Sequence, residues 1–118
     1  MQKAITCFQK AIHIQPNYAD AHNNFGLAFI KLREYHKAIS CFQKAIQLKP
    51  NHASAHSNLG IALKELGEYQ KAISCYEKAI KIDPNYSNVY YNLGNILQEL
   101  REFKKAKSCY EKLLKLNP

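Results

Sequence analysis

Cysteine and histidine are the side chains in this sequence best suited to metal binding or nucleophilic chemistry. The four cysteines are each separated by 34 residues: Cys7, Cys41, Cys75 and Cys109. His52 and His56 lie four residues apart, so they could share one face of a helix as two metal ligands. No carboxylate or cysteine is evidently placed to complete such a site. We therefore expect ordinary surface or packing histidines and no metal.

The equal spacing of the cysteines places each of them at the same site of a repeating unit. Equivalent sites in stacked helices are separated by roughly 8–10 Å, which exceeds the roughly 7 Å limit for bridging two cysteines. The spacing predicts free thiols that act as small packing residues. The sequence also has no glycine-rich phosphate loop and no Ser/His/Asp arrangement. We expect no catalytic residue and no cofactor, and therefore no enzyme activity of this chain.

Length and composition favour one folded domain. The chain has 118 residues, 47% of them hydrophobic, with four glycines and four prolines. No apolar run approaches the roughly 20 residues of a membrane span, and Lys3 and Lys10 interrupt the N-terminal region where a signal peptide would be apolar. A cytoplasmic location is the default expectation. The net charge of +8 could attract acidic partners, membranes or nucleic acid, or could belong to a solvated lysine-rich surface.

The same 34-residue period governs the residues that shape a fold. Prolines and glycines recur in fixed phases, at Pro16, Pro50, Pro84 and Pro118 and at Gly26, Gly60 and Gly94. A period of this length is typical of stacked-repeat architectures. Each unit has apolar residues at three- and four-residue steps in two segments, which predicts two amphipathic helices. We expect an all-α solenoid of seven helices, with a half repeat at 1–18 and repeats at 19–52, 53–86 and 87–118.

Capping residues support these helix limits. Gly67 follows the first helix of its unit, where a left-handed cap suits glycine. Arg33 and Arg101 occupy the same position without that freedom, so their turns need another solution. Each proline ends a second helix. The asparagines that follow three of the prolines are expected as N-caps: Asn17, Asn51 and Asn85.

The sequence resembles the tetratricopeptide repeat family over its whole length. The residues that carry the resemblance in the last repeat are Tyr90, Leu93, Gly94, Ala106, Tyr110 and Pro118. Departures are His22 and His56, where the family often has tryptophan, and Leu113 in place of a second alanine. The resemblance implies a right-handed solenoid whose first helices line a concave groove that binds a peptide or partner domain. Carried over, the groove positions are Asp20, Asn23, Asn24, Leu27 and Lys31, then Ser54, Ser57, Asn58, Ile61 and Glu65, then Asn88, Tyr91, Asn92, Asn95 and Glu99.

One groove position is asparagine in all three repeats: Asn24, Asn58 and Asn92. A carboxamide both donates and accepts, so it can pair with a peptide backbone without selecting a sequence. Rungs roughly 10 Å apart would meet an extended peptide once every three residues, since it rises about 3.3 Å per residue. The arrangement is similar to the asparagine ladder in the repeat region of O-linked N-acetylglucosamine transferase. The alternative is that these asparagines brace adjacent helices.

Two other ligand classes are disfavoured. Family members that bind chaperone C-termini use basic residues at positions occupied here by Asn23, Asn88 and Asn92. The lysines form two series at the same period, Lys3, Lys37, Lys71 and Lys105, and Lys10, Lys44, Lys78 and Lys112. They are expected on the outer face of the second helices, without the arginines and aromatics of a nucleic-acid surface.

The ends of the array suggest self-association. Apolar flanks could remain uncovered at one end by Ala4, Ile5, Phe8 and Ile12, and at the other by Ala106, Tyr110, Leu113 and Leu114. Three functions stay open: a protein-interaction scaffold, a substrate-recruiting segment of a larger enzyme such as a glycosyltransferase, and a self-assembly module.

Overall fold

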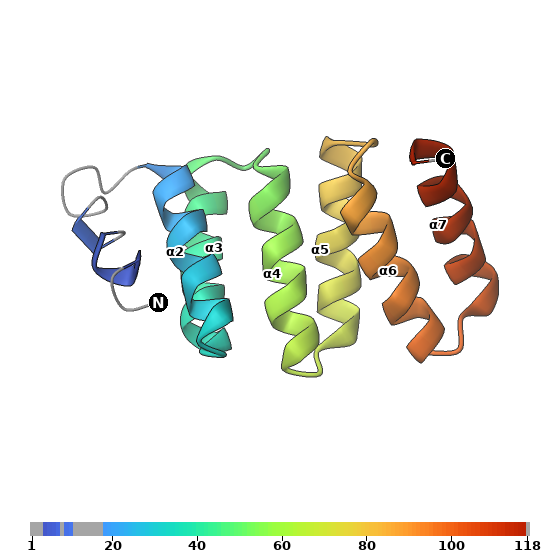
Figure 1. The fold of residues 1–118 in the computed structure, drawn as a ribbon, viewed down its shortest axis with the longest axis horizontal. Coiled ribbons are helices and arrows are strands. Elements are labelled where there is room, and N and C mark those ends of the chain that lie inside the picture. Colours follow the sequence, from blue (N-terminus) through green and yellow to red (C-terminus); the bar gives the residue numbers. More distant parts are fainter. Residues whose placement is uncertain (1–3, 8, 11–17, 118) are drawn as a thin grey trace.

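The computed structural model describes residues 4–7, 9–10 and 18–117, and these residues form a single row of helices (Figure 1). The complete helices are α2 (Ala19–Lys31), α3 (Tyr35–Leu48), α4 (Ala53–Glu65), α5 (Tyr69–Ile82), α6 (Ser87–Glu99) and α7 (Phe103–Leu116). Helices α2, α4 and α6 begin at the first residues of the three expected repeats. Residues 4–7 and 9–10 are helical where the leading half repeat was expected. Within the described part of the chain, no helix has the length and apolarity needed to cross a membrane.

The amphipathic pattern of the sequence explains why these segments pair as hairpins. In α5, Ala72, Tyr76 and Ala79 recur on one helical face, and each is at most 1% exposed. The Tyr76 ring packs directly on α4 at Gly60, where an added Cβ would lie 2.6 Å from Cε1 of the ring. The glycine is required because any side chain would occupy the volume of the ring. The same contact recurs between Gly94 and Tyr110.

The turn inside each hairpin has one residue in the left-handed conformation. Gly67 has φ +80°, as its cap position predicts, and Arg33 and Arg101 have φ 59° and 63°. The sequence suggested that the arginines would need another solution, but they adopt the same backbone conformation as the glycine. Two arginines thus carry the steric penalty of a Cβ in this region. In each turn the next residue donates its N–H to a carbonyl five positions back, at 2.8–2.9 Å, which offsets part of that penalty.

The expected asparagine N-caps are wrong by one residue. The N-caps of α4 and α6 are His52 and Tyr86, and Asn51 and Asn85 lie outside the helices. Asn17 lies outside the described residues. The prolines shift the register, because the chain makes a turn at residues 50–51 and at 84–85 before the next helix can start.

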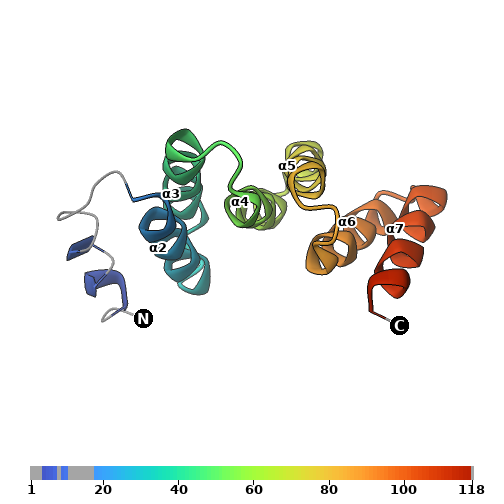
Figure 2. The same cartoon turned by 90° about the horizontal axis from the view of Figure 1, so that it is seen from above.

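The hairpins stack into an all-α solenoid with extents of 46 × 24 × 24 Å. Viewed from above, α2, α4 and α6 lie on one side of the row, and α3 and α5 lie on the other (Figure 2). We call the exposed surface of α2, α4 and α6 the first-helix face. Apolar side chains of successive hairpins interdigitate in a core that includes Tyr76, Val89, Leu93 and Ile96. Hairpin-to-hairpin contacts therefore carry the stability of the array.

Burial at the two ends differs from the expectation of two uncovered flanks. Ile5 is 6% exposed and Ala106 is 3% exposed, so neither contributes to an open apolar surface. Tyr110 and Leu113 are half-buried, and Leu114 is 65% exposed. Phe8 and Ile12 lie outside the described residues. Among the described residues of the two expected flanks, the large exposed apolar side chain is Leu114, on α7.

Candidate functional site

The residues predicted to line the groove fall into two groups by burial. The exposed members are Asp20, Asn24, Lys31, Glu65, Asn88 and Tyr91, and Asn92 and Asn95 are half-buried. Asn23, Ser57 and Asn58 are only 6%, 3% and 8% exposed. The exposed and half-buried residues form the accessible part of the first-helix face. The buried three lie where α2 and α4 or α4 and α6 approach each other, which leaves little surface for a ligand.

Between α2 and α4 the asparagines act on each other. Nδ2 of Asn58 donates to Oδ1 of Asn23 at 3.0 Å and lies 3.4 Å from Oγ of Ser54. Nδ2 of Asn23 also donates to Oγ of Ser54, at 3.3 Å. One of the Asn58 bonds joins α4 to α2 and the other lies within α4, and together they use both donors of Asn58. At this step of the array, the geometry matches the brace that was the alternative to a peptide-binding ladder.

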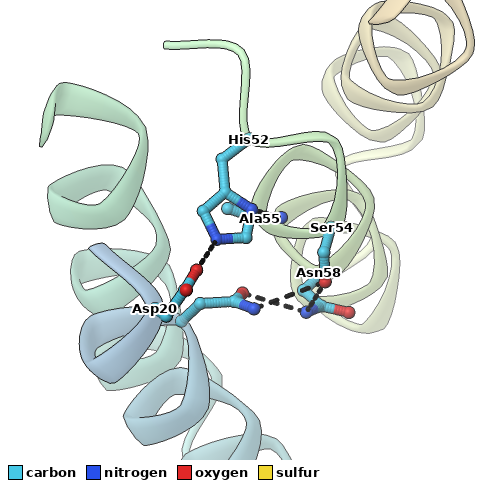
Figure 3. A network of polar contacts seen from close by, with 6 residues as sticks. Asp20, His52, Ser54, Ala55 and Asn58 are labelled. Atoms are coloured by element: carbon cyan, nitrogen blue, oxygen red, sulfur yellow. Dashed lines mark hydrogen bonds and ion pairs between the residues drawn. The ribbon is translucent and has the colours of Figure 1, made fainter. Parts of the chain in front are cut away.

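A histidine closes the same step at its upper end (Figure 3). The backbone N–H of Ala55 donates to Nδ1 of His52 at 3.2 Å, so Nδ1 carries no proton. The proton is therefore on Nε2, which donates to Oδ1 of Asp20 at 2.8 Å. His52 thus caps α4 and ties α4 to α2 in one side chain. The sequence reasoning assigned the cap to Asn51, and the signal that it missed was a side-chain acceptor one residue later.

The step between α4 and α6 is more open. A hollow of about 200 Å³ is lined by Ile61, Lys64, Glu65, Tyr76, Asn92 and Asn95. We call it the α4–α6 hollow. It brings together four predicted groove residues, Ile61, Glu65, Asn92 and Asn95. Within the described chain, no hydrogen bond engages the carboxamide of Asn92. Asn92 is therefore available to a ligand where Asn58 is not.

Different neighbours explain the different behaviour of the two asparagines. Asn58 has Asn23 as its neighbour on the preceding first helix. The equivalent neighbour of Asn92, one repeat later, is Ser57. Serine has a shorter side chain and no carboxamide oxygen. Asn24 is exposed, with no preceding first helix among the described residues to brace. The three predicted rungs therefore occupy three different environments.

Among the described residues, the cysteines and histidines do not come together in a metal or nucleophilic centre. All four cysteines are free thiols, and burial raises the pKa of Cys41 and of Cys75 to about 11. Such thiols are almost fully protonated at neutral pH and are poor nucleophiles. His56 uses Nε2 to contact the carbonyl of Pro50 at 2.9 Å. In the part of the chain that the structure describes, no three metal-binding side chains come together.

The first of the two lysine series on the second helices is partly neutralised by neighbouring glutamates. Lys37, Lys71 and Lys105 each form an ion pair with the glutamate three residues earlier, at 3.5, 3.6 and 3.9 Å. The side chains of Lys71 and Lys105 are 71% exposed, so these pairs add little stability. Alternating charge of this kind is typical of a solvent-exposed helix face.

Three larger hollows lie on the other side of the array, and one of them has a volume of about 400 Å³. The remaining two have volumes of about 420 Å³ each and are lined at the same repeat positions, including Ile39, Leu59 and Leu63 in one and Ile73, Leu93 and Leu97 in the other. They form because α3, α5 and α7 do not contact one another directly in the described structure. Both of these hollows therefore follow from the stacking geometry, and neither is lined by a predicted groove residue.

Comparison with known proteins agrees with this architecture. Tetratricopeptide repeat models match residues 53–86 and 75–108, and a TPR repeat model matches residues 1–33 and 26–67. The chain belongs to the tetratricopeptide repeat family. Among curated proteins no match was found. The family and fold of this tetratricopeptide array are those of protein-interaction scaffolds, which are typically non-enzymatic.

Solved structures of MamA are similar to the tetratricopeptide array. Two crystal structures of MamA share 29% and 30% sequence identity with it, cover 95% and 98% of it, and each have a TM-score of 0.88. A structure titled "MamA RS-1 ArsTM double mutant" shares 26% identity over 98% of the array, also with a TM-score of 0.88. The array spans between 63% and 66% of the length of these three chains.

Proposed function

We propose that the first-helix face binds an extended segment of a partner polypeptide, and that the strongest contacts lie at the step between α4 and α6. The observation that carries the proposal is the unpaired carboxamide of Asn92 in the α4–α6 hollow, next to Glu65 and Asn95. A carboxamide can donate to a peptide carbonyl and accept from the next peptide N–H. Exposed Tyr91, on the same helix, adds apolar contact area with a polar end.

The remaining predicted groove residues have secondary roles in this proposal. Asn24 and Lys31 of α2 and Asn88 of α6 are exposed and extend the contact along the face. Asp20, Asn23, Ser57 and Asn58 hold α2, α4 and α6 together or are buried between them. Of the three equivalent asparagines, Asn92 is thus the one that we expect to bind the peptide, with Asn24 making a weaker contact.

Selection of peptides tests the proposal directly. Random twelve-residue peptides displayed on phage are selected on the immobilised array, and the selected peptides are then synthesised and their dissociation constants measured by calorimetry. Removal of the Asn92 side chain by Asn92→Ala should weaken binding about tenfold, since it leaves one or two peptide groups unpaired. The matched control is Gln43→Ala, an exposed amide on α3, which should change binding by less than about twofold.

Two results would contradict the proposal. One is the selection of peptides whose affinity is the same for the wild type and for Asn92→Ala. The other is a larger loss with Gln43→Ala, which would place the ligand on the second helices. Either result is interpretable only if the variants keep the helical circular dichroism of the wild type.

The cytoplasmic location expected from the sequence stays a prediction. Recruitment of a substrate to an enzyme, which would use the same face, also stays a prediction.

Self-association through α7 is a second candidate. Its support is the exposure of two apolar side chains on this helix, Phe103 at 53% and Leu114 at 65%. Apolar residues exposed together favour contact with another molecule. Light scattering over a wide concentration range should show an average mass that rises with concentration, and Leu114→Lys should reduce that rise. A constant monomer mass for the wild type would remove this candidate.

A further inference from the structure

A core tyrosine extends its hydroxyl to the first-helix face. Tyr76 belongs to α5, a second helix, and its side chain is 1% exposed. Its ring crosses the backbone of α4 at Gly60, where an added Cβ would lie 2.6–3.1 Å from three ring carbons including Cζ, the carbon that bears the hydroxyl. Tyr76 also lines the α4–α6 hollow with Asn92. The ring is therefore part of the core, and its polar end reaches the hollow.

The equivalent residue in the next hairpin shows what this hydroxyl requires. Tyr110 crosses α6 at Gly94 in the same way. Its hydroxyl donates to Oδ1 of Asn95 at 2.6 Å and lies 3.0 Å from Oε1 of Gln98. In the hairpin of Tyr76, these two acceptor positions are occupied by Ile61 and Lys64.

Neither of these residues can accept a hydrogen bond. Isoleucine has no polar atom, and a lysine ammonium group only donates. The Tyr76 hydroxyl consequently lacks the acceptors that Tyr110 has, and within the described residues it makes no hydrogen bond. It is also not sealed inside the protein, since no buried side-chain oxygen or nitrogen in that part of the chain is left unpaired. Burial of the ring, followed by the charges of Cys75 and Glu65, raises the pKa of Tyr76, so the hydroxyl keeps its proton and remains a donor.

The other groups of the hollow define the ligand that would satisfy this donor. Lys64 and Glu65 carry opposite charges, so the hollow has no net charge to match an ion. Asn92 supplies a second donor and an acceptor, and Asn95 keeps its own Nδ2 after its oxygen is used by Tyr110. The hollow thus offers several hydrogen-bond donors to a single oxygen atom of a ligand, with acceptors close to them.

We infer that the α4–α6 hollow takes the side-chain carboxamide of an asparagine or glutamine in the bound polypeptide, and that Tyr76 is the specificity-determining donor to its oxygen. The inference rests on the proposed function, because it assigns a side-chain preference to the same face. The carbonyl oxygen would accept from Tyr76 and Lys64, and the NH₂ group would donate to Glu65 or to Oδ1 of Asn92. A hollow of about 200 Å³ has room for such a group, since a 150 Å³ cavity holds benzene.

Other side chains fit this set of groups less well. The hollow holds one cationic and one anionic group, so it has no net charge that would compensate a carboxylate or an ammonium group for its lost hydration. An aliphatic side chain would bury donors and acceptors with no partner. A site built around hydrogen bonds rejects a ligand that lacks them more strongly than an apolar site rejects a small change in size.

The test uses the peptides selected on the wild-type array from the random twelve-residue library. The selected peptides should share an asparagine or glutamine at one fixed position. Replacement of that residue by leucine should weaken binding to the wild type about tenfold. The same replacement should change binding to the Tyr76→Phe variant by no more than about twofold. This variant removes a single oxygen and is expected to fold, because Phe42 fills the equivalent core position with 0% exposure.

A matched hydroxyl deletion provides the control. Tyr90 lies on α6, and its hydroxyl donates to the carbonyl of Pro84 at 2.8 Å. Tyr90→Phe should leave the preference for a carboxamide as it is in the wild type. Equal circular dichroism spectra and urea midpoints of the two variants would show that both have folded.

The outcomes separate this inference from the proposed function. Peptides that lack a shared asparagine or glutamine, yet bind about tenfold more weakly to Asn92→Ala, would leave the proposed function standing and overturn the role of Tyr76. If replacement of the shared asparagine or glutamine by leucine still weakens binding about tenfold in Tyr76→Phe, the role of Tyr76 is overturned and the proposed function still stands. If no peptide is enriched, or if Asn92→Ala has no effect on any of them, both the proposed function and this inference fail.

Discussion

The double role of His52 makes a stability prediction that can be worked out from the structure. His52→Ala removes the side-chain cap of α4, which is typically worth about 1 kcal/mol. It also removes the hydrogen bond to Asp20, which we take as about 1 kcal/mol because 55% of the Asp20 side chain is exposed and solvent weakens the interaction. The total loss should be about 2 kcal/mol. At roughly 4 °C per kcal/mol for a chain of this size, the melting temperature should fall by about 8 °C.

Urea unfolding monitored by circular dichroism measures this loss, and two variants separate its causes. His52→Asn keeps a capping oxygen and loses only the contact with Asp20, so it should lose about half as much stability as His52→Ala. His56→Ala removes a histidine of the same helix whose hydrogen bond to Pro50 is exposed, and it should cost less than about 0.5 kcal/mol. If His52→Ala and His56→Ala were equally mild, the argument that His52 joins α2 to α4 would be refuted.

Three further predictions concern the turns, the core and the thiols. Gly60→Ala should destabilise the array by about 1–2 kcal/mol in urea unfolding, because the overlap with the Tyr76 ring outweighs the better helix propensity of alanine; a stabilised variant would contradict this. Arg33→Gly should raise stability by about 0.5 kcal/mol, since glycine tolerates φ 59° and its greater unfolded-state entropy offsets only part of the gain; an unchanged or lower melting temperature would count against strain at this turn. Burial raises the pKa of Cys41 to about 11, so iodoacetamide at pH 8 should modify exposed Cys7 well before Cys41. The rate of modification at Cys41 should rise as the pH approaches 11. Peptide mass spectrometry of timed samples measures both rates.

The architecture was predictable from sequence because every hairpin obeys the same packing constraints. Gly60 and Tyr76 must co-occur, since the ring fills the space that a side chain on the glycine would take. The same pairing repeats at a fixed period, so one recognisable contact locates all the others. The caps were less predictable. A proline fixes the end of one helix but not the start of the next, and the turn after Pro50 moved the cap of α4 from Asn51 to His52.

The candidate site was harder to predict because identical residues have different neighbours. Asn58 and Asn92 are indistinguishable by position and type, yet Asn58 is bonded to Asn23 and Asn92 is not paired with Ser57. The ring of Tyr76 belongs to the core, but the residue also lines the α4–α6 hollow, where its hydroxyl matters. The signal was present in the sequence. Ile61 occupies the position where Asn95 accepts the equivalent hydroxyl in the next hairpin, but its meaning depends on a contact that only the fold reveals.

The ring that crosses α4 at Gly60 also bears on how such a surface can evolve. Phenylalanine and tyrosine codons differ by one base, and both residues fill this position in the array, as Phe42 and as Tyr76. A single base change inside a second helix can therefore add or remove a donor on the opposite surface while the shape of the core stays the same. Ligand preference can drift through positions that look purely structural in a sequence comparison, and a search for determinants confined to exposed residues would miss them.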